Sequence, residues 1–174
     1  PNTKYGAISF YDLVSESIKR PIFSYEDNTW GDPQCNLKSK KLSPHGMDLI
    51  KRYDGKFMLA VVNHLPKETI ELYELIENDS IDLIWRGCVD APKNKYFNDV
   101  ALKKDGAFYV THMYDSDSSQ WSIALASMFK NSTGEVYFWS SDQGFSVVPN
   151  TEGSFPNGID LDLSLIHISE PTRR

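Results

Sequence analysis

Apolar and polar residues alternate along the chain in a way that predicts a succession of β-strands. β-Branched and aromatic runs are separated by clusters of Asp, Gly, Asn and Pro, which favour turns. Segment 69–76 alternates apolar and polar residues for part of its length, which predicts a strand with one buried face. The expected strands are 6–14, 45–50, 57–64, 69–76, 81–89, 98–103, 107–113, 134–140 and 144–150.

One segment, WSIALASMF at 121–129, departs from this pattern and predicts a short helix. Trp121, Leu125 and Phe129 are spaced by four residues and therefore fall on one helical face. We expect this face to pack on the neighbouring sheet rather than to bind a membrane or a partner.

A short motif recurs three times where strands are expected to begin. It reads PHGMDL at 44–49, FNDVAL at 97–102 and PNGIDL at 156–161. In each copy a His or Asn precedes a Gly or Asp, and a Leu closes the motif. The interval is about 55 residues, and a period near 50 with four strands per unit is typical of β-propeller blades.

The innermost strand of each propeller blade begins near one mouth of the central channel. His45, Asn98 and Asn157 hold the same position in the three copies. A propeller would bring them together at its axis although they are far apart in sequence. For any single copy the alternative is a turn residue at a strand start, since Asn and Asp favour such places. Three aligned copies favour a shared site.

The composition is that of one globular domain, with 174 residues, 40% hydrophobic and 24% charged. The net charge of −6 argues against nucleic acid and anionic membranes as main partners. No apolar run approaches the roughly 18 residues of a membrane span. Cys35 and Cys88 could pair or stay free, so the cysteines do not settle the compartment.

The last residues of the chain differ in character from the rest. We assign 1–162 to a partial propeller domain and 163–174 to a non-native tail, because LSLIHISEPTRR resembles a translated sequencing adapter. A native amphipathic tail is the alternative. A propeller with blades missing has open sheet edges, so we expect the isolated chain to aggregate or fold loosely and to be inactive.

The Asn residues of the motif are candidate ligands of a hard cation. Calcium takes roughly 6–8 oxygen ligands, and amide oxygens are common among them. Zinc would require Cys or several clustered His residues, and that set is lacking. Asp99 follows Asn98 directly, and adjacent strand residues face opposite sides. If both are ligands, they would serve two different ions; otherwise Asp99 is a turn or capping residue.

His45 and His64 lie at the ends of two strands that are expected to pair, which could bring their imidazoles together at one mouth. Such a pair beside a cation can deprotonate water and hold or relay the proton. A structural role is the alternative for each, and His112, at another predicted strand end, competes for any role. The sequence contains no Gly-x-Ser-x-Gly nucleophile motif and no Gly-rich phosphate loop.

Taken in order, the segments SPHGMDLI, LAVVNH, TIELYEL, FNDVALKKDGAFYVTH and EGSFPNGIDL resemble the paraoxonase/arylesterase family. This family belongs to a wider group of six-bladed propellers that includes the senescence-marker/gluconolactonase enzymes. The resemblance covers 6–162, about half of a family member. It implies an all-β fold, a partial six-bladed β-propeller with about three blades present.

The resemblance also implies calcium-dependent hydrolysis of lactones, aryl esters and organophosphate triesters. It leaves the localisation unknown, since a secreted and a membrane-associated protein both fit the family. His45 matches the family's general base, and His64 matches its partner. The implied calcium ligands are Asn98 and Asn157 for a catalytic ion, and Asp99 with the backbone carbonyl of Met47 for a structural ion.

Three departures from the family pattern affect this assignment. The family's upstream Glu-Asp calcium pair has no match, because Glu26–Asp27 lies too close to His45. The remaining Asp-Asn ligands would lie beyond Asp162. His112–Met113 replaces an Asn-Asp pair of the family, which affects substrate preference. The alternatives are a gluconolactonase-type sugar lactonase and a non-catalytic propeller scaffold.

Overall fold

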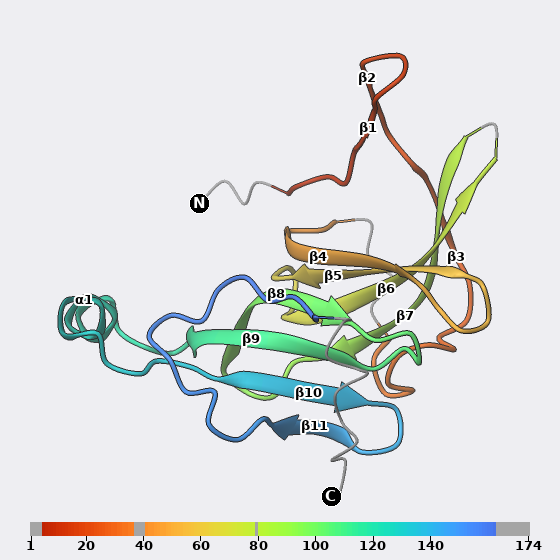
Figure 1. Ribbon diagram of the computed structural model, residues 1–174. Coiled ribbons are helices and arrows are strands. Elements are labelled where there is room, and N and C mark those ends of the chain that lie inside the picture. The colour runs from red at the N-terminus through yellow and green to blue at the C-terminus, as the bar shows by residue number, and fades with distance from the viewer. Residues whose placement is uncertain (1–4, 37–40, 79, 163–174) are drawn as a thin grey trace, which may run out of the picture.

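The computed structural model describes residues 5–36, 41–78 and 80–162, and Figure 1 shows their arrangement. These residues form eleven strands and one helix, which confirms the all-β prediction. The predicted tail at 163–174 lies outside the described residues. The elements are β1 (Phe10–Asp12), β2 (Ser17–Lys19), β3 (Ile22–Tyr25), β4 (Pro44–Lys51), β5 (Phe57–Asn63), β6 (Thr69–Glu77), β7 (Ile81–Asp90), β8 (Lys95–Leu102), β9 (Phe108–Asp115), α1 (Gln120–Phe129), β10 (Val136–Ser140) and β11 (Gly144–Val147).

Two sheets make up most of the structure. The first has five strands in the order β3-β7-β6-β5-β4, in which β4 to β7 form an antiparallel meander and β3 adds to β7 in parallel. The second is a four-stranded antiparallel meander in the order β11-β10-β9-β8. Each meander begins with a strand that carries one copy of the repeated motif.

The two sheets meet along these first strands, β4 and β8. Asp48 Oδ2 in β4 accepts a 2.7 Å hydrogen bond from the backbone N–H of Leu102 in β8. Successive four-stranded meanders with adjacent first strands are the arrangement of neighbouring propeller blades. The partial β-propeller is therefore confirmed. Two such meanders are present among the described residues, and the predicted blade numbers of three and six stay predictions.

The third copy of the motif, at 156–161, is not a strand. A strand needs a partner whose backbone completes its ladder of hydrogen bonds, and this segment forms no ladder with the described strands. Side chains hold its backbone instead. Thr111 Oγ1 donates a 2.6 Å hydrogen bond to the Asn157 carbonyl, and Asp99 Oδ2 accepts one of 3.1 Å from the Ile159 N–H.

The hydrophobic core has two parts. The larger cluster lies between the sheets and contains Met58, Ala60, Val62, Ile70, Leu72, Val89, Phe97, Val100, Leu102, Phe108, Val110, Tyr137 and Trp139. The second cluster contains Ile8, Cys35, Leu42, Leu59, Val61, Tyr73, Leu83, Trp85 and Cys88. Residues of the N-terminal segment thus cover the outer face of the first sheet. Strand β6 is consequently buried on both faces for most of its length, so the prediction of a half-buried strand is wrong.

Glu71 in β6 lies on the face of the first sheet that the N-terminal segment covers, and it is buried there. Its carboxylate accepts 2.7 Å hydrogen bonds from Thr69 Oγ1 and from Trp85 Nε1. Burial raises the pKa of Glu71 to about 7, because the loss of hydration outweighs these two hydrogen bonds; the nearby Asp90 charge adds to the rise.

We expect the free energy of unfolding to fall as the pH rises from 4.5 to about 7. Glu71 keeps its proton in the folded protein over this interval but releases it in the unfolded chain, so the protonated carboxyl favours folding. This contribution, on the order of 3 kcal/mol, is complete below the unfolded pKa and is lost as the pH passes the folded one. Urea denaturation of wild type and Glu71→Gln across this interval measures it. An equal pH slope in both proteins would contradict the prediction.

The N-terminal segment differs from its prediction. Strand β1 covers only part of the expected strand at 6–14, because Asp12 Oδ1 accepts hydrogen bonds from the N–H groups of Val14 and Ser15 and turns the chain. Strand β2 then returns along β1, and this hairpin projects away from both sheets (Figure 1). Farther along, Cys35 forms a disulfide with Cys88 and so links the N-terminal segment to β7.

The predicted helix is present as α1, but its apolar face does not pack on a sheet. Ser119 caps its N-terminus by accepting a hydrogen bond from the Ser122 N–H. Trp121 is 81% exposed, and Leu125 and Phe129 are also exposed. The helix lies beyond the end of β9, out of reach of the sheet faces (Figure 1), so the packing prediction is wrong. The described helix is too short to cross a membrane.

Candidate active site

Both motif copies that lie in strands contain a register shift at the same place. The pairing of β4 with β5 shifts within PHGM, and the pairing of β8 with β9 shifts within FNDV. Two residues of the first strand therefore oppose one of the second, at His45–Gly46 and at Asn98–Asp99. Such β-bulges re-aim side chains and are common beside active sites. The simple alternation of faces expected for Asn98 and Asp99 does not continue through the bulge.

Asp99 connects all three motif copies. Its carboxylate lies so close to Gly46 that an added Cβ there would be 2.2 Å from Oδ1. Its Oδ2 accepts the Ile159 N–H, and its own N–H donates to Thr111 Oγ1 at 3.0 Å. Thr111 in turn donates to the Asn157 carbonyl. The structure therefore brings the three copies side by side, and the Asp99 carboxylate and the Thr111 hydroxyl attach the third copy to the second.

His45 and His64 are in direct contact at this end of the first sheet. His45 Nδ1 lies 2.9 Å from His64 Nε2, and the two rings meet edge to face with centroids 5.1 Å apart. His64 directly follows β5, and its backbone N–H donates to the Ser43 carbonyl at 3.2 Å. Two imidazoles joined in this way can pass a proton from one ring to the other.

Glu68 belongs to the same cluster, and the sequence analysis missed it. Both of its carboxylate oxygens lie 2.9 Å from His64 Nδ1, and Oε1 also accepts the Phe97 N–H at 2.9 Å. The loop that carries His64 and Glu68 is held by the buried Asn63, whose amide donates to carbonyls within it. An acidic residue four positions after a candidate catalytic His was the signal in the sequence.

Aromatic rings fix the plane of the second imidazole. The His64 ring stacks on Tyr96 with centroids 4.2 Å apart and an interplanar angle of 10°. Tyr96 stacks in turn on Tyr114 at 4.9 Å. The stack spans both sheets, since His64 follows β5 of the first sheet, whereas Tyr96 in β8 and Tyr114 in β9 belong to the second. It restricts rotation of His64 and so keeps its Nε2 directed at His45.

Asn98 is the buried amide beside this cluster. It is 3% exposed, its amide nitrogen contacts Met113 Sδ at 3.8 Å, and no donor to its side-chain oxygen exists among the described residues. An amide oxygen that accepts no hydrogen bond from the protein is free to serve as a ligand of a hard cation. Asn157 offers a second, exposed amide. The described part of the chain holds no group of three His, Cys, Asp or Glu side chains arranged for a metal.

A family comparison decides what kind of protein carries this arrangement. A model of the arylesterase family matches residues 33–174. The chain belongs to the arylesterase family. The match covers both His residues of the pair and all three motif copies, so the resemblance found in the sequence is confirmed. Comparison with individually curated proteins gave no match.

The arylesterase family is a family of ester-hydrolysing enzymes, and this chain is one of its members. The remaining predicted residues of this arylesterase-family chain are placed as follows. Met47 lies in β4 directly after the bulge, with its side chain 47% exposed. Glu26, which was not assigned a calcium role, forms an ion pair with Arg86.

His112 does not join the His pair. It is 1% exposed, with Nε2 3.3 Å from Asp115 Oδ1 and Nδ1 3.4 Å from Glu135 Oε1. Neither nitrogen makes a well-oriented hydrogen bond to a described residue. Burial and the nearby Lys95 charge lower the pKa of His112 from its ordinary value. His112 is thus buried beside a group of charged residues of its own, whereas the next residue, Met113, contacts Asn98.

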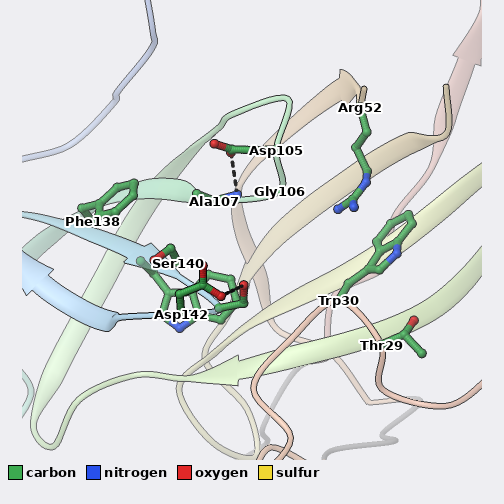
Figure 2. Close-up of a pocket in the computed structure, with 11 residues that line it drawn as sticks. Thr29, Trp30, Arg52, Asp105, Gly106, Ala107, Phe138, Ser140 and Asp142 are labelled. Atoms are coloured by element: carbon green, nitrogen blue, oxygen red, sulfur yellow. Dashed lines mark hydrogen bonds between the residues drawn. The ribbon is translucent and has the colours of Figure 1, made fainter. Parts of the chain in front are cut away.

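A cavity with charged lining residues lies elsewhere, as Figure 2 shows. It has a volume of about 260 Å³ and is lined by the turns that follow β4, β8 and β10, at the ends of the strands opposite the His pair. The Arg52 guanidinium lies 4.6 Å from the centre of the Trp30 ring, and Asp105 accepts the Ala107 N–H. These charged groups are engaged locally, and none of the predicted site residues lines this cavity.

Replacing Gly46 with Ala is expected to destabilise the protein and disturb the site together. The new Cβ would lie 2.2 Å from Asp99 Oδ1 and 2.5 Å from the Asn98 carbonyl oxygen, so β4 and β8 would have to separate. We expect a loss of roughly 1–3 kcal/mol in unfolding free energy, as for other overpacked sites. Chemical denaturation measures this. Gly153→Ala is the matched control, because its Cβ would make only ordinary contacts; equal losses in both variants would contradict the prediction.

Proposed function

We propose that this arylesterase-family protein is a calcium-dependent hydrolase of lactones and aryl esters. The observation that carries the proposal is the hydrogen-bonded His45–His64 pair, which lies at the end of the sheets where the motif copies meet. A neutral imidazole pair is suited to activating water near pH 7. No covalent nucleophile motif offers a competing route through the same residues.

His45 is the base in this proposal. Its Nδ1 is occupied by His64, so Nε2 is the ring nitrogen left to take a proton from water. The water oxygen attacks the ester carbonyl carbon, and the carbonyl electron pair moves to oxygen. The tetrahedral oxyanion then collapses, the bond to the leaving oxygen breaks, and that oxygen receives the proton.

The oxygen ligands of the site fit calcium better than zinc. Asn98 and Asn157 would hold a catalytic ion, and Asp99 with the Met47 carbonyl would hold a structural one. Asp99 already accepts two backbone N–H groups, but a carboxylate has further lone pairs to offer. A bound calcium ion would polarise the ester carbonyl and stabilise the oxyanion.

The substrate class can be tested by hydrolysis of three compounds with the full-length protein: an aromatic lactone, an aryl acetate and a sugar lactone. Turnover of the first two supports the proposal. Turnover of the sugar lactone alone would favour a gluconolactonase-type enzyme. A folded protein that hydrolyses none of them would favour a non-catalytic propeller scaffold.

A further inference from the structure

The two His residues of the pair form a longer chain of contacts that ends at Glu68. Glu68 lies 2.9 Å from His64 Nδ1 through both oxygens, and His64 Nε2 lies 2.9 Å from His45 Nδ1. The side chains of His64 and Glu68 are 13% and 20% exposed, so water competes weakly for this contact. The order carboxylate, imidazole, imidazole therefore runs from the loop after β5 to the start of β4.

This order determines where the ring protons lie. An ionised carboxylate only accepts hydrogen bonds, so His64 must carry its proton on Nδ1. Neutral His64 then has a bare Nε2, which can only accept, and His45 must donate to it from Nδ1. The bare nitrogen of His45 is therefore Nε2. Each ring is left with one possible tautomer, and the lone pair at the outer end belongs to His45.

We propose that Glu68 is a positioning residue that fixes the tautomers of both His64 and His45 and so directs the His45 Nε2 lone pair outward. The inference rests on the proposed function for its catalytic meaning, but the tautomers themselves are a property of the folded protein. Glu68 does not touch substrate; it acts through His64.

Neighbouring groups leave Glu68 available for this role. Lys67, the adjacent cation, forms an ion pair with Asp90 instead. The Phe97 N–H that Oε1 also accepts holds the carboxylate in position without donating a charge. The Tyr96 stack holds the plane of His64, while Glu68 selects which of its nitrogens carries the proton.

The proton balance of the hydrolytic step is consistent with this arrangement. When His45 Nε2 takes a proton from water, the Nδ1 proton of His45 can move to His64 Nε2. His64 then carries protons on both nitrogens beside the Glu68 carboxylate, which stabilises the imidazolium. The charge formed is thereby placed next to an opposite charge, and the reverse transfers return the proton to the leaving oxygen.

The first test is nitrogen-15 NMR of the imidazole rings in the full-length wild-type protein. We expect a protonated, pyrrole-type Nδ1 and a bare, pyridine-type Nε2 for neutral His64, and the same pattern for His45. In Glu68→Gln, the amide NH₂ can donate to His64 Nδ1, so this single pattern should be replaced by the opposite tautomer or a mixture. A bare Nδ1 on His64 in wild type would overturn the proposal without any activity measurement.

The second test separates positioning from binding. Glu68→Gln should lower kcat by about 10–100-fold with little change in KM, as for other residues that orient a functional imidazole. Glu77→Gln removes an equal charge from the exposed end of β6 and should leave kcat unchanged. An unchanged kcat in Glu68→Gln, or a loss expressed only in KM, would overturn the positioning role. If wild type hydrolyses none of the substrates, the proposed function fails, and the NMR result still decides the tautomers.

Discussion

Removing calcium from the full-length protein with a chelator is expected to abolish hydrolysis of lactones and aryl esters, and added calcium should restore it. The contact that the described residues make with the Asn98 side chain comes from Met113, which carries no charge to stabilise a developing oxyanion. Loss of one oxyanion donor costs other enzymes about 100–1000-fold in kcat, so loss of a divalent charge should cost at least as much. Rates measured with chelator, and again after calcium is restored, test the prediction. Activity that persists in chelator would remove calcium from the mechanism.

Metal binding can also be measured without substrate. Terbium luminescence, sensitised by nearby aromatic rings, should report an ion at the site and should weaken in Asn98→Ala. Among the described residues the Asn98 amide makes only the long contact to Met113 Sδ, so the substitution removes a ligand without breaking a strong hydrogen bond. Asn131→Ala, at the exposed turn after α1, is the matched control. Equal luminescence in Asn98→Ala and in wild type would contradict the ligand assignment.

Replacing His45 with Gln is expected to lower kcat about 100–10,000-fold, the usual contribution of a general base. Glutamine cannot take up a proton at neutral pH, so water would have to attack without a base. Stability should change by less than about 0.5 kcal/mol, because the His45 side chain is exposed. Initial rates and a denaturation curve of the same preparation distinguish the two effects. A kcat equal to that of wild type would show that His45 is not the base.

The sequence was sufficient for the fold class because its signals are local. Strand periodicity, turn clusters and the repeated motif depend on residues near one another in the chain. The helix at 120–129 followed from the same kind of pattern. The errors arose where tertiary neighbours decide. The burial of the second face of β6, the exposure of Trp121 and the absence of a strand at 156–161 each depend on what lies beside the segment.

The same distinction between local signals and tertiary neighbours applies to the candidate site. The pairing of His45 with His64 could be anticipated, since both lie at ends of adjacent strands. The β-bulges that place His45 and Asn98 could not, because a bulge is defined by a mismatch between two strands. The sequence also could not show that His112 stays apart from the His pair. Its partners Asp115 and Glu135 become its neighbours only when β9 and the segment before β10 come together.

By itself, the sequence determined that this protein is an all-β chain with a repeated motif of the arylesterase family, and it named the His and Asn residues of that motif. Only the tertiary structure decided how they are used. It joined Cys35 to Cys88, seated Asp99 against Gly46 and added Glu68 to the His pair. The physical reason is that periodicity reports which face of a segment is apolar, whereas hydrogen bonds between distant segments depend on positions to within a few tenths of an ångström, which only the packed fold determines.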